Sequence, residues 1–181
     1  MREASRPEFF PQTPKADSYG SDSDEEELLR LIGNSENADQ VPNIYRLIDE
    51  NKLEEIKSLI AKNADVLNVK DQSRDFPILY AIKNGNTEIA LEFIMCNKEV
   101  LKQKDYSGVN PFFYAIYYDN LELVKFIIKT KPEIIDEKYE EDLLPIFYVI
   151  ANNKLEALEE ILKLCPESLE HKNEGFYIFF N

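Results

Sequence analysis

Past residue 40, the apolar positions of the chain follow a pattern that repeats every 34 residues. The segments "PILYAI", "PFFYAI" and "PIFYVI" begin at Pro77, Pro111 and Pro145, and one further step back reaches "NIYRLI" at Asn43. Three more sets recur at the same spacing: Ile48, Ile82, Ile116 and Ile150; Glu54, Glu88, Glu122 and Glu156; and Lys70, Lys104, Lys138 and Lys172. Four copies in register without a gap predict a repeat architecture.

Each copy predicts two short helices. A proline suited to the first turn of a helix opens the first apolar segment. That segment is followed by a residue type that tolerates the left-handed conformation ending a helix: Asn51, Gly85, Asp119 or Asn153. A second segment, such as "LELVKFIIK", then has apolar residues at helical spacing. A connector without clear periodicity leads to the next proline, and "DQSRD" and "DYSGVN" within it indicate turns.

Two repeat families have about this period, and both consist of helix pairs. Tetratricopeptide repeats have longer helices, a short connector and a proline near the end of the repeat. Here the helices are short, the proline opens the first helix and the connector is long, so residues 42 to about 173 resemble the ankyrin repeat family. "PILYAI" and "PFFYAI" keep the proline, the apolar position and the alanine of that family's Thr-Pro-Leu-His motif, which two small residues follow. "LELVKFIIK" matches the family's second helix.

The chain departs from the family motif at several positions, and the second small residue of the motif is isoleucine in every copy. The motif threonine is Phe76, Asn110 or Leu144, and the motif histidine is Leu79, Phe113 or Phe147. We therefore expect apolar packing in place of the hydrogen-bonded link between those two residues. The turn glycine survives only as Gly108, with Arg74 and Asp142 at the corresponding positions.

The resemblance implies an all-α fold, an ankyrin-type solenoid of helix-turn-helix repeats with short hairpin-like connectors. The expected organisation is a disordered acidic, proline-containing tail at 1–23, a capping helix and linker at 24–41, repeats at 42–75, 76–109, 110–143 and 144–173, and a partial fifth repeat or C-terminal cap at 174–181. Because one such unit cannot bury its apolar face alone, we expect the four recurring isoleucines inside, with Tyr80, Tyr114 and Tyr148 at least partly buried.

The composition and net charge argue against some classes of partner. The 181 residues are 44% hydrophobic and 31% charged, as in an ordinary globular protein, but the net charge is −14. That charge argues against nucleic acid or an anionic membrane as partner, because both require a basic surface. No apolar run approaches the ~18 residues of a membrane helix, so we expect no membrane insertion. We expect an intracellular, cytoplasmic monomer, with a nuclear location left open.

The residues that usually carry chemistry are few. The chain has a single histidine, His171, and two cysteines, Cys96 and Cys165, which we expect to act as small hydrophobes. No nucleophile–histidine arrangement and no zinc spacing can be assembled, so we expect no catalysis, cofactor or metal. In "SDSDEEE", Ser21 and Ser23 have an acid three positions on, as acidophilic kinases require. Alternatively, these acids begin the capping helix that precedes Gly33.

The resemblance also implies a concave binding surface, formed by the loop tips and the solvent face of each first helix. Mapped onto this chain, the predicted partner contacts are Gln72, Asp75 and Lys83; Tyr106, Val109, Tyr117 and Tyr118; and Glu140, Glu141 and Leu143. In "NPFFYAIYYDN", Phe112 and Tyr114 fall at core positions, whereas Tyr117 and Tyr118 fall at contact positions. The alternative is that these two tyrosines only cover the helix end and pack on Tyr106.

An aromatic centre flanked by the carboxylates of Asp49, Glu50, Glu140 and Glu141 predicts a protein partner with an apolar patch and a basic rim. The predicted function is a non-catalytic protein–protein interaction module, an adaptor or effector. A regulatory or scaffolding fragment of a larger multidomain protein is the alternative, favoured by the segment "GFYIFFN" at 175–181, which occupies the start of a fifth unit.

Overall fold

The computed structural model describes residues 44–71, 73–139, 143–166 and 168. Its α-helices are α2 (Ile44–Asp49), α3 (Leu53–Lys62), α4 (Pro77–Lys83), α5 (Thr87–Cys96), α6 (Pro111–Tyr117), α7 (Leu121–Thr130), α8 (Pro145–Ala151) and α9 (Leu155–Leu164). Among the described residues no strand occurs, and one isolated antiparallel bridge joins Tyr139 to Leu143. The expectations for 1–23, with Ser21 and Ser23, for 24–41 and for 174–181 lie outside the described residues.

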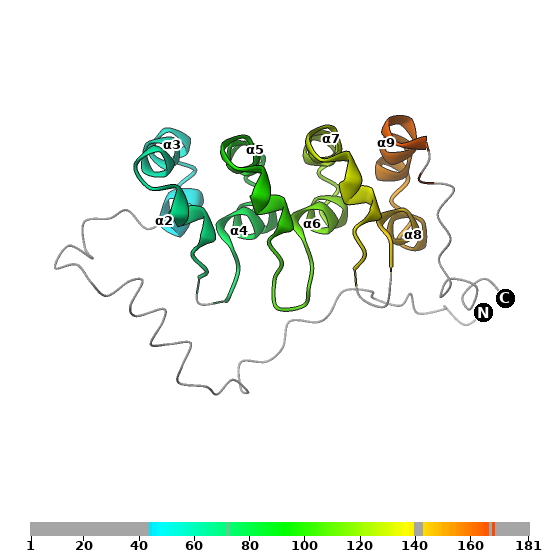
Figure 1. Cartoon of the computed structure of the whole chain (residues 1–181), viewed down its shortest axis with the longest axis horizontal. Coiled ribbons are helices and arrows are strands. Elements are labelled where there is room, and N and C mark those ends of the chain that lie inside the picture. Colours follow the sequence, from blue (N-terminus) through cyan, green and yellow to red (C-terminus); the bar gives the residue numbers. More distant parts are fainter. Residues whose placement is uncertain (1–43, 72, 140–142, 167, 169–181) are drawn as a thin grey trace. The chain divides into compact units, whose positions relative to one another are not determined.

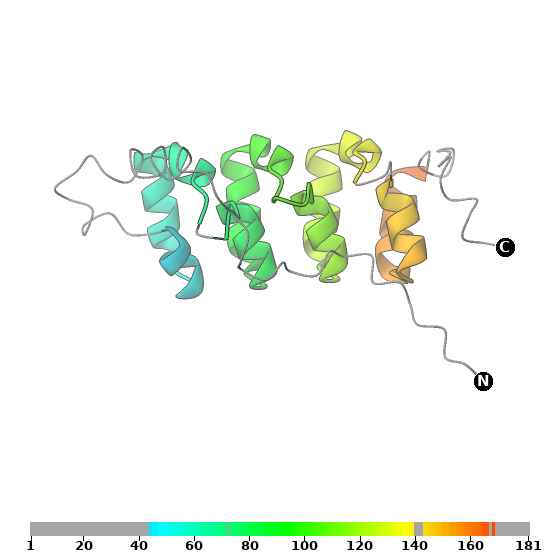
Figure 2. The ribbon, with the colours of Figure 1, turned by 90° about the horizontal axis from the view of Figure 1, so that it is seen from below.

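The helices form pairs that stack side by side in chain order. In Figure 1 the first helices, α2, α4, α6 and α8, make one row, and the second helices, α3, α5, α7 and α9, make the other. Figure 2 shows from below how the pairs follow one another along the array. Loops leave the row of first helices between consecutive pairs (Figure 1). The all-α arrangement of helix pairs expected from the sequence is therefore confirmed.

The residues predicted to end the first helices have the predicted conformation. The φ angles are 52° at Asn51, 75° at Gly85, 54° at Asp119 and 53° at Asn153. At each of them the backbone N–H donates to the carbonyl of the residue three positions earlier, which is the recurring isoleucine. Prolines occupy the first turn of α4, α6 and α8, as predicted. The recurring glutamates lie in the first turn of α3, α5, α7 and α9, where a negative charge is favourable.

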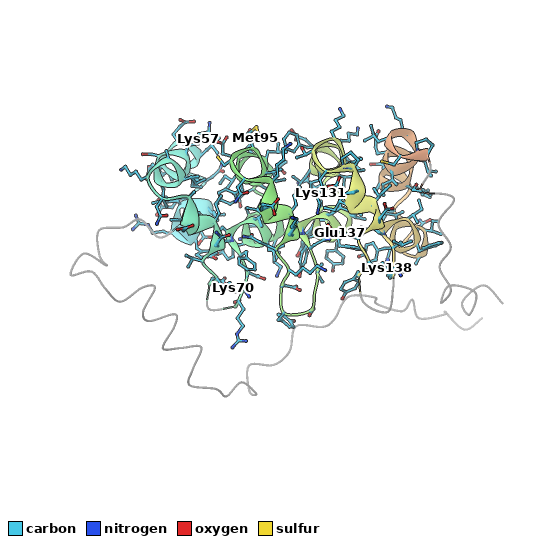
Figure 3. All side chains as sticks on the ribbon, viewed as in Figure 1. Lys57, Lys70, Met95, Lys131, Glu137 and Lys138 are labelled. Carbon is cyan, nitrogen blue, oxygen red and sulfur yellow. The ribbon has the colours of Figure 1, made fainter. Side chains whose placement is uncertain are left out.

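Each connector begins with a short 3-10 helix, which the sequence pattern did not reveal. These are η1 (Ala64–Asn68), η2 (Lys98–Lys102) and η3 (Pro132–Asp136). Asn63 and Asn97 cap the first two, since their side-chain oxygens accept the N–H of the residue two positions on, at 3.0 Å in both cases. Lys131 takes the corresponding place before η3 and pairs instead with Glu137, beside it in Figure 3.

The core lies between neighbouring pairs. Ile48, Ile82 and Ile116 are buried, as are Tyr114 and Tyr148, and Tyr80 is half-buried. The prediction that Ile150 is interior is wrong: its side chain is 39% exposed. The physical reason is that Ile150 belongs to the last described pair, so no described pair follows to cover it.

Two smaller predictions, on the cysteines and on the motif positions, are each confirmed only in part. Cys165 is buried, as expected of a small hydrophobe, but Cys96 is exposed at the end of α5. Apolar packing does replace the motif histidine at Phe113, whose ring centroid lies 5.4 Å from Tyr139 and 5.5 Å from Tyr148. Asn110, in place of the motif threonine, still forms hydrogen bonds, because its side-chain oxygen accepts the backbone N–H of Phe112 and Phe113 and so caps α6.

Replacing Ile116 with alanine tests the core. We expect a loss of about 2–5 kcal/mol in the free energy of unfolding, because Ile116 is fully buried. Met95→Ala is the control: Met95 is 60% exposed on the outer row of helices (Figure 3), so its loss should stay within about 0.5 kcal/mol. Urea unfolding followed by circular dichroism measures both variants, and equal midpoints would contradict the core assignment.

Candidate functional site

The candidate surface is built around the end of α6. Tyr117 is the last residue of this helix and Tyr118 follows it, with its N–H bonded to the carbonyl of Tyr114. Asp119 then turns the chain in the left-handed conformation. Because the helix stops at this point, two consecutive tyrosines project from its end. Their exposed fractions are 40% for Tyr117 and 46% for Tyr118.

The two tyrosines pack on each other and on the helix below them. The rings of Tyr117 and Tyr118 meet edge to face with centroids 4.9 Å apart, and Tyr118 stacks on Tyr114 at 6.2 Å. Tyr106, on the preceding loop, is 50% exposed. The observed ring contacts place the pair on Tyr114, and packing on Tyr106 stays an untested alternative.

A lysine from the next helix pair holds the position of Tyr117. The Nζ atom of Lys154 donates to the Tyr117 carbonyl oxygen at 2.9 Å and to the Asp119 carboxylate at 2.7 Å. The same atom lies 5.9 Å from the centre of the Tyr117 ring, within the range of a cation–π interaction. Sequence reasoning missed Lys154. Its signal is weak, because the same repeat position is Lys52 in the first pair and Asn86 and Asn120 in the next two.

Beneath the tyrosines lies a network in which two buried aspartates contact a half-buried lysine and a buried tyrosine. Lys83 donates to both carboxylate oxygens of Asp75, at 2.8 and 2.7 Å, and its Nζ lies 4.7 Å from the centre of the Tyr114 ring. The Tyr114 hydroxyl donates to Asp105 at 2.6 Å. Burial and this hydrogen bond raise the pKa of Tyr114 far above its ordinary value, so its hydroxyl is a neutral donor. The network fixes Tyr114, on which Tyr118 stacks.

Two residues predicted as partner contacts, Val109 and Asp75, are buried at this network. Val109 was expected on the exposed loop tip, but it is 0% exposed. Its N–H donates to the Asp105 side chain at 2.9 Å and its carbonyl accepts the Asp105 N–H, so the loop turns back at this residue and encloses its side chain. Asp75 is only 6% exposed for a similar reason: its N–H donates to the Asp71 carboxylate and its own carboxylate faces Lys83.

The other predicted contacts are distributed unevenly. Lys83 and Leu143 are half-buried, and Gln72, Glu140 and Glu141 lie outside the described residues. Two carboxylates predicted as the rim, at and just after the end of α2, already have partners. The Asp49 carboxylate accepts the Tyr80 hydroxyl at 2.8 Å, and Glu50 Oε1 lies 3.5 Å from Arg46 Nε. The exposed centre of the candidate site is therefore Tyr106, Tyr117 and Tyr118.

Among the described residues, neither a metal-ligand cluster nor a membrane-spanning helix occurs. No group of three or more histidine, cysteine, aspartate or glutamate side chains among them could hold a metal ion. In the same part of the chain, every helix falls short of the length and apolar character of a membrane span.

The chain matches a model of a known family. The family model described as ankyrin repeats, in three copies, matches residues 44–138, which span α2 to η3. Such repeats are generally protein–protein interaction modules that bind protein partners, and they are typically non-catalytic. Comparison with curated proteins gave no match.

Replacing Lys83 with methionine tests the network. We expect the free energy of unfolding at pH 7 to fall by about 2 kcal/mol or more, because the buried Asp75 carboxylate loses its partner. Burial already raises the pKa of Asp75, and Lys83 opposes that rise, so the variant should raise this pKa further. A raised pKa means proton uptake on folding, so stability falls as pH rises from the ordinary aspartate range to the raised pKa.

The loss caused by Lys83→Met should therefore shrink as the pH is lowered from 7 towards 5. Lys129→Met, at an exposed position of α7, is the control and should show neither effect. Urea unfolding of both variants at several pH values measures the difference. A loss in Lys83→Met that is the same at every pH would show that Asp75 does not depend on Lys83.

Proposed function

The chain belongs to the ankyrin repeat family, and on that basis we propose that it is a non-catalytic adaptor or effector that binds a protein partner on its loop and first-helix surface. The exposed tyrosines Tyr106, Tyr117 and Tyr118 form the centre of the proposed site. The observation that carries the proposal is the packing of Tyr117 and Tyr118: both are exposed, yet their rings are fixed by Tyr114 and Lys154.

Fixed aromatic side chains suit the role of an anchor. A tyrosine that is already packed loses little side-chain entropy when a partner covers it, so more of the contact free energy appears as affinity. Anchors of this kind are enriched in tyrosine and lie near the centre of an interface. The partner should therefore present an apolar patch to the two rings.

The proposed partner also has a basic rim. The chain carries a net charge of −14, and its exposed acids include Glu122 and Glu156 in the first turns of α7 and α9. Basic residues at the edge of the partner would be attracted over a distance of about a Debye length. Gln72, Glu140 and Glu141, which lie outside the described residues, stay proposed contacts.

Alanine substitution of the tyrosines tests the anchor. Proteins captured from a cell extract by the wild-type chain but not by a Tyr117→Ala/Tyr118→Ala chain are identified and purified, and each dissociation constant is measured. We expect each single substitution to cost about 2 kcal/mol of binding, which is a rise in Kd of about 30-fold. Met95→Ala on α5 is the control and should leave Kd unchanged.

The thermal midpoint of each variant separates lost binding from lost folding. Tyr117→Ala is the cleaner of the two, because Tyr118 also stacks on Tyr114. If Tyr117→Ala changes neither Kd nor the midpoint, the two tyrosines do not anchor a partner.

The salt dependence of binding tests the basic rim. Raising the salt concentration from about 0.05 M to about 0.5 M should slow association with the purified partner, because it screens attraction between separated charges. Dissociation should change less, since apolar contacts at the tyrosines hold the complex together. Stopped-flow or surface-based kinetics measures both rates. An association rate that does not depend on salt would contradict the proposed basic rim, but it would not contradict the tyrosine anchor.

A further inference from the structure

The last described helix pair exposes a face whose equivalent is buried in each of the earlier pairs. Three sets of apolar positions lie between neighbouring pairs, and in the first three pairs all nine side chains are buried: Ile48, Ile82 and Ile116; Ile56, Ala90 and Val124; and Ile60, Ile94 and Ile128. In α8 and α9 the corresponding residues are Ile150, which is exposed, and Leu158 and Leu162, which are half-buried. Leu155, beside them at the start of α9, is 58% exposed.

After α9, the backbone forms the same hydrogen bond that it forms after α5 and α7. The N–H of Ser168 donates to the Cys165 carbonyl at 3.1 Å. The corresponding bonds after α5 and α7 join Val100 to Asn97 at 3.2 Å and Ile134 to Lys131 at 3.1 Å. Ser168 is also buried, as Val100 and Ile134 are. The 34-residue register therefore still holds at Ser168.

The residues that come next have the composition of a segment that fits this face. Residues 175–180 read "GFYIFF", with no charged side chain. In the 34-residue register, Phe180 takes the position of Ile78, Phe112 and Ile146, which are all buried. An extended chain from residue 168 to 175 reaches up to about 24 Å. That exceeds the length of a ten-residue helix such as α9, about 15 Å, so the segment can reach the whole face.

We propose that residues 175–180 dock on the open face of α8 and α9, formed by Ile150, Leu155, Leu158 and Leu162, and cover it as a following helix pair would. Contact between aromatic and aliphatic side chains provides the attraction, and no new ion pair is needed. The docked segment closes an apolar surface that would otherwise favour association with other chains. This intramolecular site is separate from the tyrosine surface on α6, so either proposal can fail without the other.

Paired substitutions in the full chain test the proposal. Phe179→Ser/Phe180→Ser should lower the thermal midpoint by at least about 5 °C and increase amide exchange in α8 and α9 by at least tenfold, because the face loses its cover. The matched control is Phe9→Ser/Phe10→Ser, which makes the same change at two adjacent phenylalanines in the N-terminal segment. The control should alter neither measurement.

A double-mutant cycle with Ile150→Ala establishes where the segment docks. If Phe179 and Phe180 cover Ile150, then Ile150→Ala lowers the midpoint less in the Phe179→Ser/Phe180→Ser chain than in the wild-type chain. Additive effects, or an unchanged midpoint in Phe179→Ser/Phe180→Ser, would overturn the proposal. Light scattering at several protein concentrations gives the remaining outcome: a dimer whose midpoint rises with concentration assigns the face to a second copy and also overturns it.

Discussion

The structure depends on the burial of each helix pair by its neighbours. The first helices have six or seven residues and the second helices ten, lengths at which an isolated helix is hardly stable in water. Side chains such as Ile82 and Val124 are buried only because another pair lies against them. Stability is then approximately a sum over interfaces between neighbours. Polar contacts cross the same interfaces, as when Asn120 donates to Thr87 at 2.7 Å. A functional residue on one pair is therefore held in place by residues of the next.

The features that the sequence predicts best are those that a single residue imposes on the local backbone. A left-handed residue must end each first helix, and the chain provides Asn51, Gly85, Asp119 and Asn153 at the required offset. The period also identifies which positions face a neighbouring pair. It carries no information on whether a neighbour is present, so Ile150 was placed in the interior. The 3-10 helices escaped prediction because five residues are too few to show a helical period, although Asn63 and Asn97 marked their starts.

The loops were predicted less well, because exposure there depends on single hydrogen bonds. Family position alone placed Asp75 and Val109 on the surface. In the structure, an aspartate four residues earlier, Asp71 or Asp105, accepts the N–H of each and draws the loop back. The spacing of these aspartates is visible in the sequence. Only the structure shows that Asp105 accepts hydrogen bonds from both the Val109 N–H and the Tyr114 hydroxyl. Lys154 was missed because its contacts reach back 37 residues to the Tyr117 carbonyl.

In the proposed interface, the charges near the tyrosines and the rings themselves would play different parts. Both cations beside the rings are already neutralised within the chain, Lys83 by Asp75 and Lys154 by Asp119. Neither cation beside Tyr117 and Tyr118 is therefore unpaired, although the whole chain is strongly acidic. A basic partner would be attracted by the distant acids but held by the rings, since contact at the rings requires no new burial of an unpaired charge. Because Tyr118 stacks on Tyr114, which the core between pairs fixes, the affinity of the proposed surface would depend on the packing of the array beneath it.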